Sequence, residues 1–302
     1  MSPRRAHALF ALVCLLFSTT WLAIRIGLAD LPPLGAAGLR FLVAFPVLLA
    51  IARWKGLPLP RTRADWVLAL QLGMTMFTIP FALIYFAEQT VPSGLAAVLF
   101  SAHAIFVALL AHFVLHDEPL TPARVLGIAV CLAGLLIVFH DRLHGAGSWL
   151  GEAALILTAA VQATSSIAIR RARGRVPAVT LSCIGTGVGA VVLLGASAAL
   201  GEPLLERMTP KGAASIVYLG IFGSVIAFTL TIRLIEVLGA NRLAMTVYIT
   251  PVAALLWGWL FLGEQLGRGV AAGAACIVGG VWLAGRTPAP PAATAAASTG
   301  GR

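Results

Sequence analysis

The sequence predicts an all-α integral membrane protein with ten transmembrane helices, arranged as two inverted five-helix repeats. Hydrophobic residues make up 60% of the 302 residues, charged residues make up 11%, and the mean hydropathy is +0.96. The apolar residues occur in runs of about 20, the length a helix needs to cross a bilayer. The stretch 93–120 also reappears at 239–266, 146 positions later. A soluble fold is excluded, because the chain has too little polar surface to cover such a core.

The duplication extends beyond the two apolar stretches. Each stretch ends in an acid-x-Leu motif, at Glu118 in the first copy and at Glu264 in the second. The register then continues through two glycines seven positions apart in each copy, Gly127 with Gly134 and Gly273 with Gly280. Such a small-residue face permits close helix packing or dimerisation. An internal repeat of this kind determines the architecture of the whole chain.

Hydropathy and helix-breaking residues define the individual spans. The spans are predicted at about 6–28, 34–52, 66–86, 93–115, 122–140, 149–169, 178–200, 213–236, 242–262 and 268–285. The first repeat then covers residues 1–146 and the second covers 147–286. The tail, 287–302, has too few large apolar residues to fold and is predicted to be disordered in the cytoplasm.

The distribution of Lys and Arg predicts the orientation of the chain, because short cytoplasmic loops collect these residues. With the N-terminus inside, 15 of the 21 Lys and Arg side chains lie on the cytoplasmic side and 4 lie outside. Both termini are therefore expected in the cytoplasm. Each half holds an odd number of spans, so the second half is inverted relative to the first. By analogy of architecture, inverted repeats are typical of secondary transporters with a solute site between the halves.

Several motifs, taken in order, resemble those of a known family. They are Trp21, Arg40 followed by Phe41, Pro251 and the acid-x-Leu motifs before the glycine-spaced helices. Together with the five-plus-five arrangement, they resemble the ten-helix, EamA-like branch of the drug/metabolite transporter superfamily over nearly the whole ordered chain. The resemblance implies export or import of small organic metabolites, amino acids included, without ATP hydrolysis. One departure is Ile105 at the position equivalent to Pro251, which leaves a kink in span 93–115 open.

His103 lies near the middle of span 93–115 and is the most central ionisable residue. A titratable group at the bilayer midplane is costly, and this marks it as a candidate functional residue. Imidazole is also the side chain most readily protonated near physiological pH. His103 is therefore expected to line a solute cavity. The alternative is a neutral histidine bonded to a neighbouring hydroxyl or carbonyl group.

Two tyrosines and one carboxylate are further candidates. Tyr85, near the outer end of span 66–86, and Tyr248, next to the position equivalent to His103, are expected to contact an apolar or aromatic solute. The alternatives are the membrane-interface belt for Tyr85 and core packing for Tyr248. Glu88 is assigned to gating or structure and is expected to be a solvated carboxylate at a helix end.

Polar clusters interrupt four of the apolar spans. From them we select Trp21, Gln71, Thr78, Gln162 and Ser166 as solute-binding candidates. Such side chains either bond to solute from a cavity wall or join helices, each contributing roughly 1 kcal/mol or less.

The remaining charged residues and prolines are assigned structural or gating roles. Arg25 and Arg40 approach the outer leaflet and are expected to be structural, Arg40 from a position at a helix start, with an outer gate or an anion anchor as alternatives. Glu118 and Glu264 lie on opposite faces and are expected to act locally, as caps or contacts at the entrance to the fifth and tenth spans. Pro251 is expected to supply a kink or hinge.

Other classes of function lack their residues. The chain has no P-loop, HExxH or GxSxG motif, its four cysteines are scattered singly, and its basic residues form no single face. We therefore expect no catalytic residue, no metal, no cofactor and no nucleic-acid partner. The partners are a small-molecule solute and the bilayer, and the protein is a monomer or homodimer of the inner membrane. The sequence predicts an exporter of amino acids, aromatic or other apolar ones among them, acting by alternating access. A passive facilitator or channel and a membrane-embedded enzyme are the alternatives.

Overall fold

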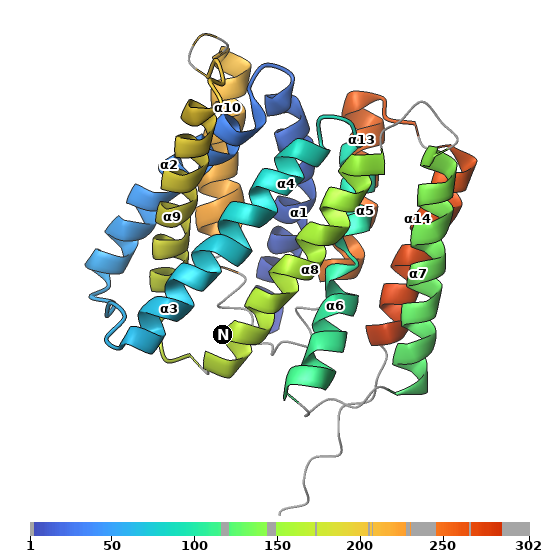
Figure 1. The fold of residues 1–302 in the computed structure, drawn as a ribbon, viewed down its shortest axis with the longest axis horizontal. Coiled ribbons are helices and arrows are strands. Elements are labelled where there is room, and N and C mark those ends of the chain that lie inside the picture. The colour runs from blue at the N-terminus through green and yellow to red at the C-terminus, as the bar shows by residue number, and fades with distance from the viewer. Residues whose placement is uncertain are drawn as a thin grey trace, which may run out of the picture.

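The structure is a computed structural model that describes residues 3–115, 121–143, 149–172, 174–204, 206, 208–227, 230, 246–265 and 267–285. Within these ranges the regular elements are helices, and none is a strand (Figure 1). The all-α prediction is confirmed for this part of the chain.

The helices follow the predicted spans closely. The first half contains α1 (Pro3–Leu28), α2 (Pro33–Trp54), α3 (Arg63–Leu72), η1 (Gly73–Thr78), α4 (Ile79–Ala87), α5 (Ser93–Phe100), α6 (His103–Leu110), η2 (Ala111–Leu115) and α7 (Pro122–Leu143). The second half contains α8 (Trp149–Ala172), α9 (Ala178–Ala199), α10 (Pro210–Tyr218), η3 (Leu219–Ile226), α13 (Thr246–Leu262) and α14 (Arg268–Gly285). Residues 231–245, which include the predicted end of the eighth span and start of the ninth, lie outside the described ranges.

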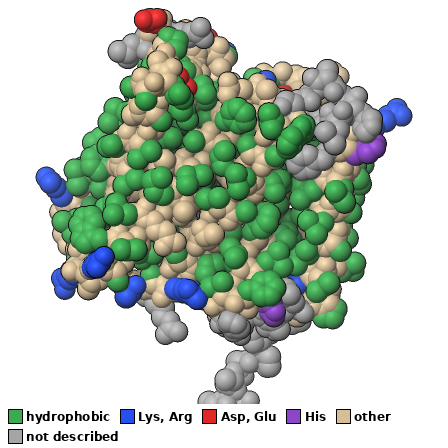
Figure 2. Space-filling model, in the orientation of Figure 1, with side chains coloured by type: hydrophobic (Ala, Val, Ile, Leu, Met, Phe, Trp, Pro, Cys, Tyr) green, Lys and Arg blue, Asp and Glu red, His purple; other side chains and the backbone are tan. Residues whose placement is uncertain are grey.

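Six helical segments of the described chain are long and apolar enough to cross a membrane. They are Ala8–Leu28, Pro33–Trp54, Arg63–Ala87, Ser93–Val114, Trp149–Ala172 and Ala178–Ala199. Four shorter apolar helices correspond to the other predicted spans. Figure 2 shows hydrophobic side chains over most of the visible face, with Lys and Arg gathered mainly along its lower left edge, where α2 connects to α3. The ten-span count and the orientation stay predictions.

The two ends of the bundle differ in charge. We call the end with the α1–α2, α4–α5, α9–α10 and α13–α14 connections the acidic end, because these connections carry Asp30, Glu88, Glu202, Glu206 and Glu264. We call the opposite end, with the α2–α3 and α8–α9 connections, the basic end. The predicted orientation puts the basic end in the cytoplasm.

Helices α7 and α14 pack backbone to backbone at one side of the molecule, as Figure 1 shows. A Cβ atom added at Gly127 would lie 2.5 Å from the carbonyl oxygen of Gly280, and one at Gly134 would lie 2.7 Å from that of Gly273. The glycine face is therefore filled within one chain. Of the two uses expected for this face, the structure shows helix packing and leaves no room there for dimerisation.

Two π-helical segments, η1 and η3, lie 146 positions apart in the sequence. Each contains a hydroxyl hydrogen bond at the equivalent position. The Thr78 hydroxyl donates to the carbonyl oxygen of Gly73 at 2.8 Å, and the Ser224 hydroxyl donates to that of Leu219 at 3.1 Å. Each bond reaches back five residues, the spacing of a π-helix. The offset is the same as that of the sequence duplication.

Candidate functional site

A break in the fourth helical segment positions His103. Helix α5 ends at Phe100 and α6 begins at His103, with Ser101 and Ala102 in a turn between them. Here backbone N–H groups bond three residues back: Ala102 to Leu99 at 3.2 Å and Ala104 to Ser101 at 3.1 Å. The chain thus turns without a proline, four residues before Ile105. Ser101 and Ala102 keep right-handed helical dihedrals, so the structure shows a tightened helical turn here, and a kink in this span stays a prediction.

His103 joins a line of side chains from four elements. Its Nε2 lies 3.2 Å from the Oγ of Ser166 on α8, and its ring stacks on Phe100 with centroids 5.7 Å apart. The Phe100 ring lies 5.5 Å from the ring of Trp21 on α1. The structure therefore brings Trp21, His103 and Ser166 together. Sequence reasoning missed Phe100, although its place three residues before His103 puts both on one face of a helix.

The bond to Ser166 also bears on the protonation of His103. One imidazole nitrogen faces a hydroxyl, which can donate or accept. The ring itself is half-buried between Phe100 and α8. The geometry suits a neutral imidazole at the wall of a binding site, and it also matches the alternative of a histidine bonded to a neighbouring hydroxyl.

Gln162 and Thr78 make bonds within the protein. Pro80 has no N–H, so the helix cannot supply the usual donor to the carbonyl oxygen of Met76, four residues earlier. The Nε2 of Gln162 donates to that oxygen at 3.3 Å. The Thr78 hydroxyl is engaged by η1, as described above. Gln162 thus compensates for a proline, a relation visible in the sequence only once the two helices are known to pack.

Gln71 lies apart from this line, in a cavity of about 370 Å³ near the basic end. The cavity lies between α3, α6, η2 and α8, and Leu110 on its wall is about two turns after His103 on the same helix. Its lining is apolar except for four side chains: Gln71, Thr164, Arg171 and Arg175. The Nη2 of Arg171 donates to the carbonyl oxygen of Val114 at 3.0 Å and so bridges α8 and η2.

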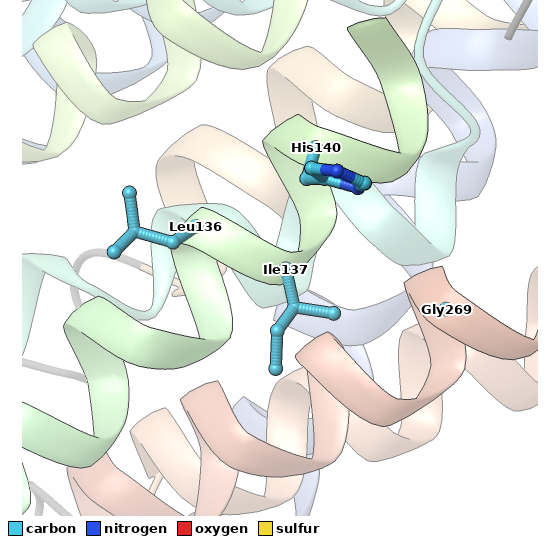
Figure 3. A pocket seen from close by; sticks show the side chains of 4 residues that line it. All are labelled: Leu136, Ile137, His140 and Gly269. Carbon is cyan, nitrogen blue, oxygen red and sulfur yellow. The ribbon is translucent and has the colours of Figure 1, made fainter. Parts of the chain in front are cut away.

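A second hollow, of about 320 Å³, lies on the α7–α14 pair and is lined by Leu136, Ile137, His140 and Gly269 (Figure 3). None of these residues is a predicted site residue. Figure 3 shows them on two helices that pack side by side, with the side chain of Ile137 on the side of Gly269. We do not assign this hollow to the candidate site.

A third group, at the acidic end, corrects the expectation for Glu88 and excludes one alternative for Tyr85. Tyr85 is 1% exposed and Glu88 is 0% exposed. Glu88 is therefore not a solvated helix-end carboxylate, and Tyr85 does not lie in an interface belt. The reason is that other elements cover the α4–α5 turn: an Arg25 Nη1 donates to the carbonyl oxygen of Glu88, and Gly151 of α8 packs on Val91.

Arg40 is also buried, with 2% of its surface exposed, and lies about two turns inside α2. The expected position at a helix start is therefore wrong. Its Nε donates to the Oγ of Ser224 in η3 at 2.9 Å, and its guanidinium lies 4.5 Å from the Phe81 ring centroid. Arg40 thus links a helix of the first half to one of the second.

Glu264 caps a helix other than the one expected. Its carboxylate accepts the backbone N–H groups of Ser93 at 2.8 Å and Gly94 at 3.1 Å, at the start of α5. The sequence predicted a local role at the tenth span, so the capping role holds but the helix is corrected. Glu118 and the side chain of Tyr248 lie outside the described residues. Pro251 lies buried within α13.

Six long apolar helices of the described chain, with polar and charged side chains buried among them, are typical of a multi-pass membrane protein. The profile of the EamA-like transporter family matches residues 4–140 and 149–286. The chain belongs to the EamA-like transporter family, as the sequence motifs predicted. The site residues themselves are not assigned by this match.

Named relatives agree with this assignment. The chain is 32% identical over 270 residues to the "Uncharacterized inner membrane transporter YedA" of Escherichia coli (strain K12), covering 86% of this chain and 84% of the relative. It is 26% identical to the "Uncharacterized transporter YoaV" of Bacillus subtilis (strain 168), covering 90% and 93%. A solved crystal structure superposes with a TM-score of 0.65 at 24% identity, covering 94% and 97%, and supports the fold alone. The protein is a multi-pass transporter of the inner membrane.

Proposed function

We propose that this transporter exports amino acids, aromatic and other apolar ones among them, by alternating access between two inverted five-helix repeats. The observation that carries the proposal is the line Trp21, Phe100, His103 and Ser166, built at a break in a membrane helix. Aromatic faces suit an apolar side chain, and a hydroxyl and an imidazole can bond to its polar groups. Broken helices near the membrane midplane are a recurring site for solute in secondary transporters.

The cavity at the basic end supports a path to this site. It shares α6 and α8 with His103 and Ser166, and its arginines can attract a carboxylate. At the acidic end, by contrast, Glu88 and Tyr85 are buried and Glu264 ties the α13–α14 connection to α5. We infer that this conformation is open toward the cytoplasm and closed outside.

A counterflow experiment tests the proposal. Liposomes that contain the purified protein are loaded with one unlabelled amino acid. Uptake of the same amino acid in tritiated form is then measured. The panel is leucine, phenylalanine, tryptophan and threonine. Transient accumulation above that in protein-free liposomes, strongest for apolar members, is the expected result. Absence of counterflow for the whole panel would contradict the proposal. A passive channel is distinguished because it gives no transient accumulation.

A further inference from the structure

We propose that Glu88 is a proton-binding site that couples transport to a proton gradient, with Arg25 and Arg40 as the cations nearby. This inference rests on the proposed function for the transport step, but the proton site itself is argued from the acidic end alone. The sequence gives little reason to expect coupling, because the carboxylates fall near span ends. The burial of Glu88 changes that expectation.

The surroundings of the Glu88 carboxyl group favour its protonated form. The side chain is fully buried, and neither of its oxygens has a hydrogen-bond partner in the described structure. An ionised carboxylate without such bonds is costly away from water, and binding a proton removes that cost. The proton adds to one carboxylate oxygen, no other bond breaks, and the charge of the cluster rises by one unit.

Charged groups from several elements lie around Glu88. Arg25 on α1 and Arg40 on α2 favour the ionised form, and Glu264 before α14 opposes it. Tyr85 lies on α4 itself, Ser93 begins α5, and Glu152 is the titratable group where α8 packs on this turn. Burial and the Glu264 carboxylate raise the pKa of Glu88, which lies just beyond the end of its span, well above the ordinary value. Opposing influences of this kind let a modest movement of Arg40 or of water change the protonation state.

Proton binding at Glu88 would also alter the interactions between the two halves at the acidic end. Arg40 of α2 bonds to Ser224 of η3, and Arg25 of α1 donates to the carbonyl oxygen of Glu88. Protonation of Glu88 changes its charge balance with Arg25, Arg40 and Glu264 at the closed acidic end, where Glu264 of the second half caps α5 of the first half. Opening of that end would expose Glu88 to outside water, and closure would bury it again. One carboxyl group would thus exchange its proton only in certain transporter conformations.

Infrared difference spectroscopy on the purified protein in lipid tests the proton site without any solute. A pH titration of the wild type is expected to show a protonated carboxyl C=O band at pH values where an exposed glutamate is ionised. Glu88→Gln should lack this band. The matched control is Glu202→Gln, which should keep it, because both Glu202 oxygens accept backbone N–H groups at the start of α2. A band unchanged in Glu88→Gln would overturn the proposal.

Transport in the same liposomes tests coupling with the amino acid that gives counterflow. A gradient of one pH unit should change wild-type accumulation by up to about tenfold for one proton per solute. Glu88→Gln should lose this response while thermal unfolding in detergent reports that the variant is folded, and Glu88→Asp should restore part of it. Wild-type counterflow with no response to the gradient would overturn coupling. Absence of wild-type counterflow would instead contradict the proposed function, and the infrared band would still decide the proton site.

Discussion

The α7–α14 pair and the central line from Trp21 to Ser166 both involve duplicated parts of the sequence, but the two copies agree in the first region and differ in the second. In the lateral pair, the same two glycines recur in both copies, and they meet crosswise: Gly127 contacts Gly280, and Gly134 contacts Gly273. In the centre, the copies differ: His103 aligns with Ile249, and Ile105 aligns with Pro251. Regular helices packed through backbone atoms hold the frame. Interrupted helices with unlike side chains lie in the centre, where we propose that the solute binds.

The difference between these regions teaches where sequence symmetry is informative. Backbone contact through glycine leaves no room for variation, because a single added carbon meets main-chain atoms. A solute site has to be asymmetric when its solute is asymmetric. Positions where the two copies disagree are therefore the better guide to function, and positions where they agree are the better guide to stability.

The largest effect is expected from Gly280→Val in the lateral pair. A Cβ at Gly280 would lie 2.5 Å from the backbone nitrogen of Cys131, so the helices must separate, at a cost of about 3 kcal/mol or more. The matched control is Gly279→Val, whose added Cβ meets no atom within 4 Å. Thermal unfolding in detergent should show a large loss for Gly280→Val only. Equal melting of the two variants would contradict the close backbone packing.

The next effect is expected from His103→Ala in the centre. The change removes the Ser166 contact and the stack on Phe100. It also removes the imidazole that we propose bonds to the solute, and loss of one such bond, about 1.4 kcal/mol, should lower transport roughly tenfold. His140→Ala is the control, because His140 lies at the lateral hollow on α7. Initial rates of counterflow in liposomes measure both variants. Unchanged transport in His103→Ala, with the same amount of folded protein, would remove His103 from the site.

Hydropathy and the repeat offset were enough to place the helices that the structure describes, because both are properties of the sequence alone. Close helix packing was expected as one of two uses of the glycine face, but the pairing of Gly127 with Gly280 was not predicted. The turn at Ser101 and Ala102 was not predicted either, because hydroxyl and backbone bonds create it without a proline. The burial of Glu88 was missed for another reason. Whether water reaches a turn depends on the loops that cover it, and no local pattern reports their packing.

The smallest effect concerns the way η1 is tied to α8, and it separates a structural role for Gln162 from a solute-binding one. Gln162→Leu leaves the carbonyl oxygen of Met76 without its donor and is expected to destabilise the protein by about 1 kcal/mol. Pro80→Ala returns a backbone N–H to the helix, so the same Gln162→Leu change should cost less in that background. A double-mutant cycle of thermal unfolding measures this coupling. An equal loss of unfolding free energy in both backgrounds would mean that Gln162 does not compensate for the missing N–H of Pro80. Its amide would then be available to bind a solute beside the central line.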